Sequence, residues 1–253
     1  MTGHAANPVI AQLQERIAHL ETGLGRARKV LPFGVAEIDR RLPGGGLGLG
    51  CLHEVAGGGN GALDGAAAAM FAAGIAARTR GKVLWILTRS DLFAPALAQA
   101  GLHPDRVIHV EAGDEKTVLA CFEEGLRHGG LGAVVAETAR LSMQASRRLQ
   151  LAAEGSDTTG LAIRRWRRHT EATDFGQPTA SATRWRVSVL PSDPLPVPGL
   201  GRARWLLELI RCRAGESADF EVEACDETGR VALPSKVVNR SPQKEDGQRF
   251  ASN

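Results

Sequence analysis

The sequence predicts an α/β fold, with a mainly parallel, twisted sheet flanked by helices and antiparallel strands at its C-terminal edge. Strand-like apolar runs alternate with helical segments from about residue 50 to residue 165, which is the pattern of a doubly wound sheet with right-handed crossovers. The run 82–88 is almost continuously apolar, as in a strand covered on both faces. After about residue 183 only strand-like segments follow.

The expected elements follow from the spacing of apolar residues and from the turn-forming residues between the apolar runs. Strands are expected at 50–56, 82–88, 106–111, 133–137, 159–165, 185–190, 203–213 and 220–224. Helices are expected at 63–80, 94–100, 115–128 and 142–154, with a polar loop at 169–183. The predicted organisation is an N-terminal helix and linker over 1–30, a core over 31–234, and a polar tail over 235–253 that is expected to be disordered.

The N-terminal helix is predicted from an Asn7-Pro8 start. Apolar residues then recur every three or four positions and mark one face: Ile10, Leu13, Ile17, Leu20 and Leu24. Gly23, Gly25 and a basic connector separate this helix from the core. We expect the stripe to make an intermolecular contact, although packing on its own domain is an open alternative.

Composition sets broad limits on the class of protein. The 253 residues are 43% hydrophobic and carry a net charge of +3, which provides no global argument for nucleic acid. The four cysteines are scattered, without a C-x-x-C pair, and predict neither a metal site nor a disulfide framework. No secretory signal or membrane-spanning run is evident, so a cytoplasmic protein without a membrane partner is expected.

The segment 57–64 has the form of a phosphate loop without its phosphate chemistry. It joins a predicted strand to a predicted helix, as G-x-x-x-x-G-K-[ST] requires. When Gly57 is aligned with the first glycine of this motif, Gly61 falls inside the loop. Ala62 then stands at the position of the second glycine, Leu63 at that of the lysine and Asp64 at that of the serine or threonine. The cation for the phosphates is missing and a carboxylate would repel a nucleotide. An ordinary glycine-rich turn is the alternative.

The order of these motifs resembles a RecA-type core over residues 31–233. The run 31–42, followed by three glycines and Leu47, is similar to the segment before the phosphate loop of RecA recombinases. The degenerate loop and the short C-terminus more narrowly resemble the ImuA family. That resemblance implies a role in the SOS response to DNA damage, in error-prone translesion synthesis. It also implies two protein partners, an ImuB-type homologue of Y-family polymerases and an error-prone polymerase, with RecA as a further candidate.

The resemblance also assigns the remaining catalytic positions. Arg89 takes the place of the acidic base after the second strand, with Asp91 nearby, and Glu137 takes the Walker B position. Because phosphoryl transfer depends on positioned cations and metal, we expect a pseudo-ATPase with no bound cofactor. An active ATPase with an atypical phosphate site is one alternative, and a division inhibitor resembling SulA is another.

A basic cluster leaves the fifth predicted strand: Arg164, Arg165, Trp166, Arg167 and Arg168. In RecA-type proteins the loop after this strand meets single-stranded DNA, and arginines around an aromatic platform suit that ligand. A protein partner could use the same residue types. An exposed alternating edge, with Trp166 packed inward, is the structural alternative.

Overall fold

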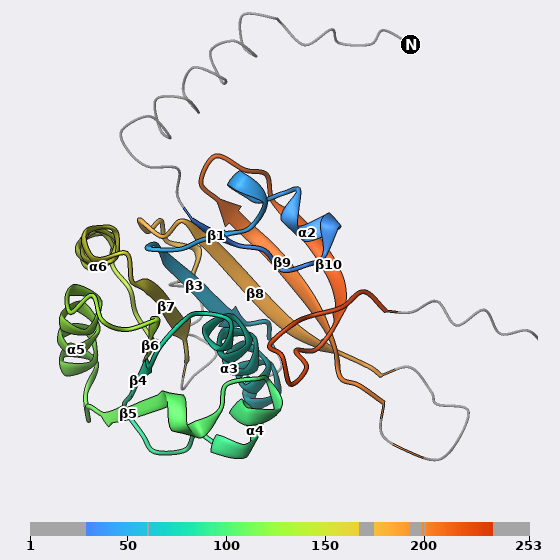
Figure 1. The fold of residues 1–253 in the computed structure, drawn as a ribbon, viewed down its shortest axis with the longest axis horizontal. Helices are drawn as coiled ribbons and strands as arrows, with labels where there is room; N and C mark the ends of the chain where they lie inside the picture. The colour runs from blue at the N-terminus through green and yellow to red at the C-terminus, as the bar shows by residue number, and fades with distance from the viewer. Residues whose placement is uncertain (1–28, 60, 167–174, 193–198, 200, 235–253) are drawn as a thin grey trace, which may run out of the picture.

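The computed structural model describes residues 29–59, 61–166, 175–192, 199 and 201–234 (Figure 1). The predicted N-terminal helix and the predicted disordered tail lie outside these described residues. Within the described part, none of the helices is both long and apolar enough to cross a membrane.

Eight strands form one sheet in the order β10-β9-β8-β3-β7-β6-β4-β5. Their bounds are β3 (Leu52–Gly57), β4 (Val83–Leu87), β5 (Val107–Glu111), β6 (Ala133–Thr138), β7 (Thr159–Arg164), β8 (Thr183–Leu190), β9 (Arg204–Cys212) and β10 (Ala218–Glu223). The strands from β8 to β5 pair in parallel, whereas β9 and β10 are antiparallel. The predicted fold class is therefore confirmed, including the antiparallel edge.

Helices cover both faces of this sheet (Figure 1). One face carries α3 (Gly61–Ala77) and α4 (Ala94–Gln99), and the other carries α5 (Glu115–Arg127) and α6 (Met143–Ser156). Side-chain caps mark the start of α5 and α6: Asp114 accepts from the Thr117 N–H at 3.0 Å, and Ser142 accepts from the Ala145 N–H at 3.2 Å. Shorter elements complete the fold: β1 (Val30–Leu31), which pairs with β2 (Leu47–Gly48), α2 (Ala36–Asp39), and two 3₁₀ turns at Pro43–Gly45 and Pro104–Arg106.

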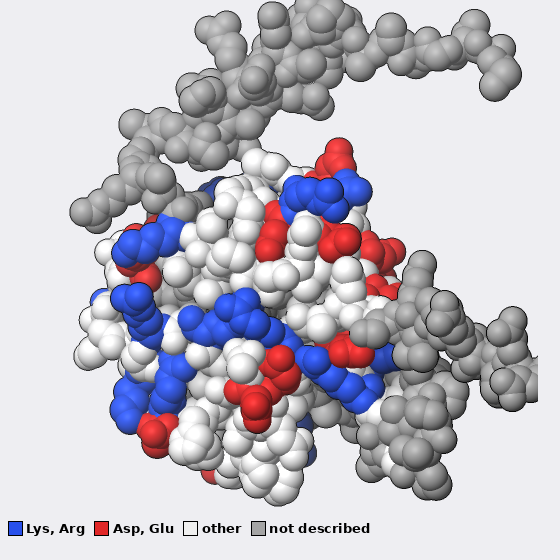
Figure 2. All heavy atoms as spheres, turned by 45° about the vertical axis from the view of Figure 1, so that its right-hand side comes forward, with Lys and Arg blue, Asp and Glu red and all other residues white. Residues whose placement is uncertain are grey.

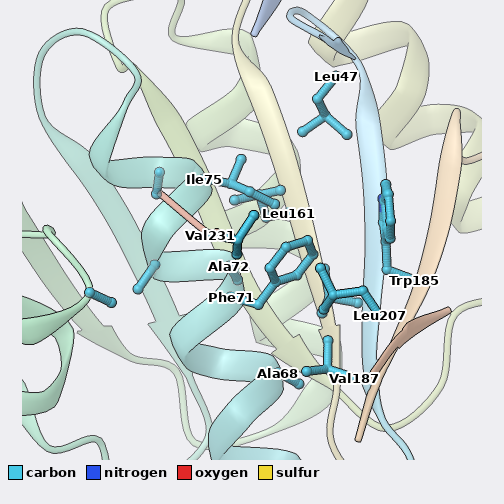
Figure 3. Close-up of a cluster of buried hydrophobic side chains, with 14 of the residues drawn as sticks. Leu47, Ala68, Phe71, Ala72, Ile75, Leu161, Trp185, Val187, Leu207 and Val231 are labelled. Atoms are coloured by element: carbon cyan, nitrogen blue, oxygen red, sulfur yellow. The ribbon is translucent and has the colours of Figure 1, made fainter. Parts of the chain in front are cut away.

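Buried hydrophobic side chains, with Phe71 of α3 and Trp185 of β8 among them, pack α3 against the sheet (Figure 3). Phe71 of α3 lies 5.9 Å from the ring of Phe33, 5.7 Å from Trp185 and 6.4 Å from Trp205. All four rings are buried, and such aromatic pairs add about 0.5–1.5 kcal/mol each to their burial. These contacts hold the middle of α3 against the sheet, and its first turn lies at the carboxyl end of β3.

Candidate functional site

The phosphate loop has the predicted strand, turn and helix context. It leaves β3 at Gly57 and enters α3 at Gly61, whose φ is +53°. Added to Gly57, a Cβ would lie 2.8 Å from the carbonyl carbon of Asp64, so the loop packs tightly on the first turn of α3. Glycine is required here by close approach of two backbones.

The carboxylate of Asp64 lies within the phosphate loop and accepts a hydrogen bond from it. Its side chain is buried, and one carboxylate oxygen accepts from the Gly59 N–H at 2.8 Å while the other accepts from the Val189 N–H at 2.9 Å. Loop N–H groups at a helix N-terminus are the groups that hold phosphate in a functional loop. Leu63, at the lysine position, is 61% exposed and offers no cation. The Gly58 N–H is also taken, by the Val187 carbonyl at 2.9 Å.

The two candidate carboxylates at the opposite side of the site are joined by Arg165. Its guanidinium donates to both oxygens of Asp91, at 2.8 and 2.6 Å, and to Glu137 at 2.6 Å. Glu137 also accepts from the indole N–H of Trp85 at 3.2 Å. The hydrogen bonds from Arg165 hold the pKa of Asp91 below its usual range, and Asp91 in turn raises the pKa of Arg165. The group next to Glu137 is thus Asp91, whereas Arg89 is exposed outside this ion triad.

Together these groups line a cleft of about 530 Å³ at the carboxyl ends of the parallel strands. One wall is the small-residue face of α3, including Ala62 and Ala66, and the other includes Leu92 and Phe93 before α4. The carboxyl edge of a parallel sheet is the expected place for a ligand in open α/β folds. In this protein the cleft has apolar walls, and its charged groups already have partners: Arg165 pairs with Asp91 and Glu137, Arg164 pairs with Glu54, and Asp64 accepts from backbone N–H groups.

The structure corrects the prediction for Arg164. Its side chain is fully buried and its guanidinium lies 2.9 Å from Glu54 of β3 and 2.8 Å from the Ala139 carbonyl oxygen. Arg184 of β8 reaches the same carboxylate, with 3.4 Å between the charged atoms. Successive side chains of a strand point to opposite faces of the sheet. The side chain of Arg164 therefore lies on the face that holds Glu54, and that of Arg165 lies on the other face. The expectation that Arg164 contacts DNA or a partner is therefore wrong.

The rest of the basic cluster is divided. Arg165 is 44% exposed at its side chain despite its two carboxylate partners. The indole N–H of Trp166 donates to the Ala139 carbonyl at 3.1 Å, and its ring lies 5.7 Å from that of Phe175. Arg167 and Arg168 lie outside the described residues, as do the five stripe residues of the N-terminal helix. The predicted inward packing of Trp166 is the alternative that its contacts favour.

Sequence reasoning missed the buried network around Glu54. Besides the two arginines, Glu54 accepts from the hydroxyl of Ser181 at 2.7 Å and from that of Thr179. Phe175 lies between the arginines, with its ring centre 5.9 Å from the Arg164 and 5.1 Å from the Arg184 guanidinium carbon. The sequence did contain a signal for this network, since Glu54 lies within a predicted apolar strand. A charge buried in such a strand requires a partner of opposite charge.

The surface charge is mixed. On the face drawn in Figure 2, Lys and Arg side chains lie beside Asp and Glu side chains, so this face is not uniformly basic. Within the described ranges, no group of three or more His, Cys, Asp or Glu residues could hold a metal ion. The charges therefore do not by themselves identify a nucleic-acid surface.

No protein-family model matches the chain. It is 39% identical over 231 residues to "Protein ImuA" of Caulobacter vibrioides, from strain NA1000 / CB15N and equally from strain ATCC 19089 / CIP 103742 / CB 15. The match covers 87% of this chain and 93% of each relative. Among solved structures, the RadB recombinase superposes with a TM-score of 0.52 at 19% identity, over 81% of this chain and all of that one. This likeness shows a RecA-like core.

Proposed function

This chain belongs to the ImuA family, and from that premise we propose that it is a non-catalytic accessory protein of damage-induced mutagenesis. Its RecA-like core serves to bind other proteins of a translesion complex and does not turn over ATP. The partners are an ImuB-type homologue of Y-family polymerases and an error-prone polymerase. Single-stranded DNA and RecA are further candidate ligands.

The carboxylate of Asp64 is the observation that carries the non-catalytic part of this proposal. It accepts from the loop N–H of Gly59 at 2.8 Å, where a nucleotide phosphate would otherwise be the acceptor. A phosphate entering the loop would meet a buried negative charge, and the apolar side chain of Leu63 offers no cation to compensate for it. On the other side, Arg165 forms ion pairs with both Asp91 and Glu137, the carboxylates that would position metal or water.

The binding part of the proposal is supported by the groups left at the surface. Arg165 and Trp166 stand at the carboxyl end of β7, where the chain continues into Arg167 and Arg168. Arginine and tryptophan are common anchors of protein interfaces and also suit single-stranded DNA. Salt dependence separates the two ligands: phosphate contacts release counterions, so replacing Arg167 and Arg168 by Ala should flatten the salt slope of DNA binding. An unchanged slope would assign these arginines to a protein partner.

Nucleotide measurements test the non-catalytic part. We expect the purified chain to release no phosphate from ATP, with or without single-stranded DNA, and to leave a fluorescent ATP analogue unbound. The variant Glu137→Gln serves as the matched control because it keeps the size of the side chain that faces Arg165. A DNA-stimulated rate that this variant abolishes would refute the proposal and establish an active ATPase.

Mutagenesis in the cell tests the biological part. Deletion of the gene should remove damage-induced mutations, and both the wild-type chain and Glu137→Gln should restore them, since no step depends on nucleotide chemistry. Co-purification from DNA-damaged cells should recover the polymerase homologue. Unchanged mutation frequency on deletion, together with recovery of a tubulin-like division protein, would favour the division inhibitor instead.

A further inference from the structure

A groove lies between α5 and α6, on the face of the sheet opposite α3 (Figure 1). Its volume is about 400 Å³, and the residues of α6 that border it include the small ones Ala152, Gly155 and Ser156. Among the described residues, a Cβ added at Gly155 would meet no atom of a neighbouring element within 4 Å. The groove is therefore open near the end of α6 and has room for a side chain of another molecule.

Exposed apolar side chains continue from this groove along α6. Leu151 lines the groove and is 62% exposed, and Met143 of the same helix is 41% exposed. These residues are eight positions apart, so they lie on one side of the helix and about 12 Å apart along it. Exposed large apolar groups beside a hollow mark an interaction site more often than scattered ones do. The ligand of the groove therefore presents apolar side chains at the spacing of an amphipathic helix.

The accessible charged groups inside the groove are guanidiniums. Arg127 of α5 and Arg148 of α6 both donate to Glu123, at 2.6 and 2.5 Å. The Glu123 side chain is only 11% exposed, whereas those of Arg127 and Arg148 are 59% and 57% exposed. The buried carboxylate thus holds the two guanidiniums in place, and a ligand meets their outer edges. Arginines fixed in this way suit a carboxylate, which can accept from more than one N–H.

Arg147 places a third guanidinium next to the apolar residues. It is exposed and lies four positions from both Met143 and Leu151, on the same side of α6. We infer that this groove binds an acidic amphipathic helix of a partner protein, whose apolar residues pack on Met143 and Leu151 and whose carboxylates pair with the arginines. The inference rests on the part of the proposed function in which the core binds other proteins.

Exposed carboxylates beside the groove argue against nucleic acid as its ligand. Glu124 is 75% exposed next to Arg127, and Glu154 is exposed in the last turn of α6. A nucleic-acid strand carries closely spaced phosphates that both carboxylates would repel, whereas separate carboxylates on a helix can meet the arginines alone. Among the described residues, no aromatic side chain lines the groove, so bases would find no stacking platform there.

Fluorescence anisotropy of a designed peptide tests the inference on the full chain. The labelled peptide has about 16 residues, enough for partial helix formation, and combines Leu at helical spacing with Glu beside it. The wild-type chain should bind it. A version with Ala in place of Leu should bind at least about tenfold more weakly, since one buried Leu contributes about that factor, and a version with Lys in place of Glu should not bind.

Three variants of the chain locate the contact. Leu151→Glu should weaken peptide binding about tenfold or more, and Arg147→Glu should weaken it and flatten its salt dependence. Gly155→Leu should also weaken it, by filling the groove without a change of charge, and the open space there leaves the fold intact. The matched control is Leu233→Glu, at a 43% exposed position beyond β10, which should bind like wild type.

Absence of peptide binding, equal affinity for the Lys version, or unchanged affinity of Leu151→Glu and Gly155→Leu would each overturn the inference. Displacement of the peptide by a single-stranded oligonucleotide would assign the groove to nucleic acid and overturn it as well. Deletion of the gene separates this result from the proposed function. If the peptide fails to bind but deletion still removes damage-induced mutations, only the groove inference fails; if deletion leaves the mutation frequency unchanged, the proposed function fails whether or not the peptide binds.

Discussion

Replacing Glu54 by Gln should destabilise the fold far more than loss of an ordinary ion pair. Glu54 is fully buried and forms ion pairs with Arg164 at 2.9 Å and with Arg184 at 3.4 Å. Glutamine keeps the shape but removes the charge, so the two buried guanidiniums lose the carboxylate that they share. Breaking a buried pair in this way costs about 3–5 kcal/mol, a large fraction of the roughly 5–15 kcal/mol by which a domain is stable.

Thermal unfolding followed by circular dichroism measures this effect. For a chain of this size about 1 kcal/mol corresponds to roughly 2–4 °C in Tm, so Glu54→Gln should lower Tm by about 6–20 °C. The matched control is Glu208→Gln on β9, whose pair with Arg186 at 3.3 Å is partly exposed and should contribute under about 1 kcal/mol. Equal Tm values for the two variants would refute the reasoning and return Arg164 to the candidate ligand contacts.

Three further predictions concern single groups. Asp64→Ala should lower the free energy of unfolding in urea by about 1–3 kcal/mol, because two backbone N–H groups lose their acceptor; an unchanged urea midpoint would contradict this. The lowered pKa of Asp91 contributes stability above the unfolded value near 3.9 and is lost as pH falls through the folded pKa. Arg165→Gln should therefore flatten the acid limb of stability against pH below about 4, and an identical limb would exclude the ion triad. Burial raises the pKa of the Cys212 thiol to about 11, so iodoacetamide at pH 8 should modify Cys212 more slowly in the native than in the urea-unfolded chain, as peptide mapping would show.

The fold was predictable because local pattern and global architecture agree. Apolar runs such as 133–137 are buried from end to end in the parallel sheet, as their lack of alternation indicated. The short elements β1, α2 and β2 before the sheet were not predicted. Among the predicted elements the errors lie at boundaries: α3 begins at Gly61 and ends at Ala77, whereas the sequence predicted 63–80. Beyond Ala77 the Thr79 hydroxyl donates to the Ala76 carbonyl at 2.7 Å, and this side-chain bond competes with continuation of the helix.

The site was predictable only in part, because neighbours in sequence were treated as neighbours in space. Arg164 and Arg165 appeared as one basic cluster, but at the end of β7 they face opposite sides of the sheet. One side holds Glu54, which is the register partner of Arg184, and the other holds Asp91 and Glu137. Pairing across strands depends on the strand order β8-β3-β7-β6, which the sequence alone did not specify.

Two side chains of the protein occupy positions in the cleft that the charged groups of a bound nucleotide and its metal would fill. Asp64 provides an anion at the N-terminus of α3, where phosphate would lie, and Arg165 provides a cation between Asp91 and Glu137, where an ATPase would use metal. Each of these charges is compensated without nucleotide. Restoring a lysine by Leu63→Lys would therefore place the new cation next to Asp64 and leave the phosphate position filled. Under the proposed function, nucleotide binding would return only if both the anion and its cationic counterpart across the cleft were replaced.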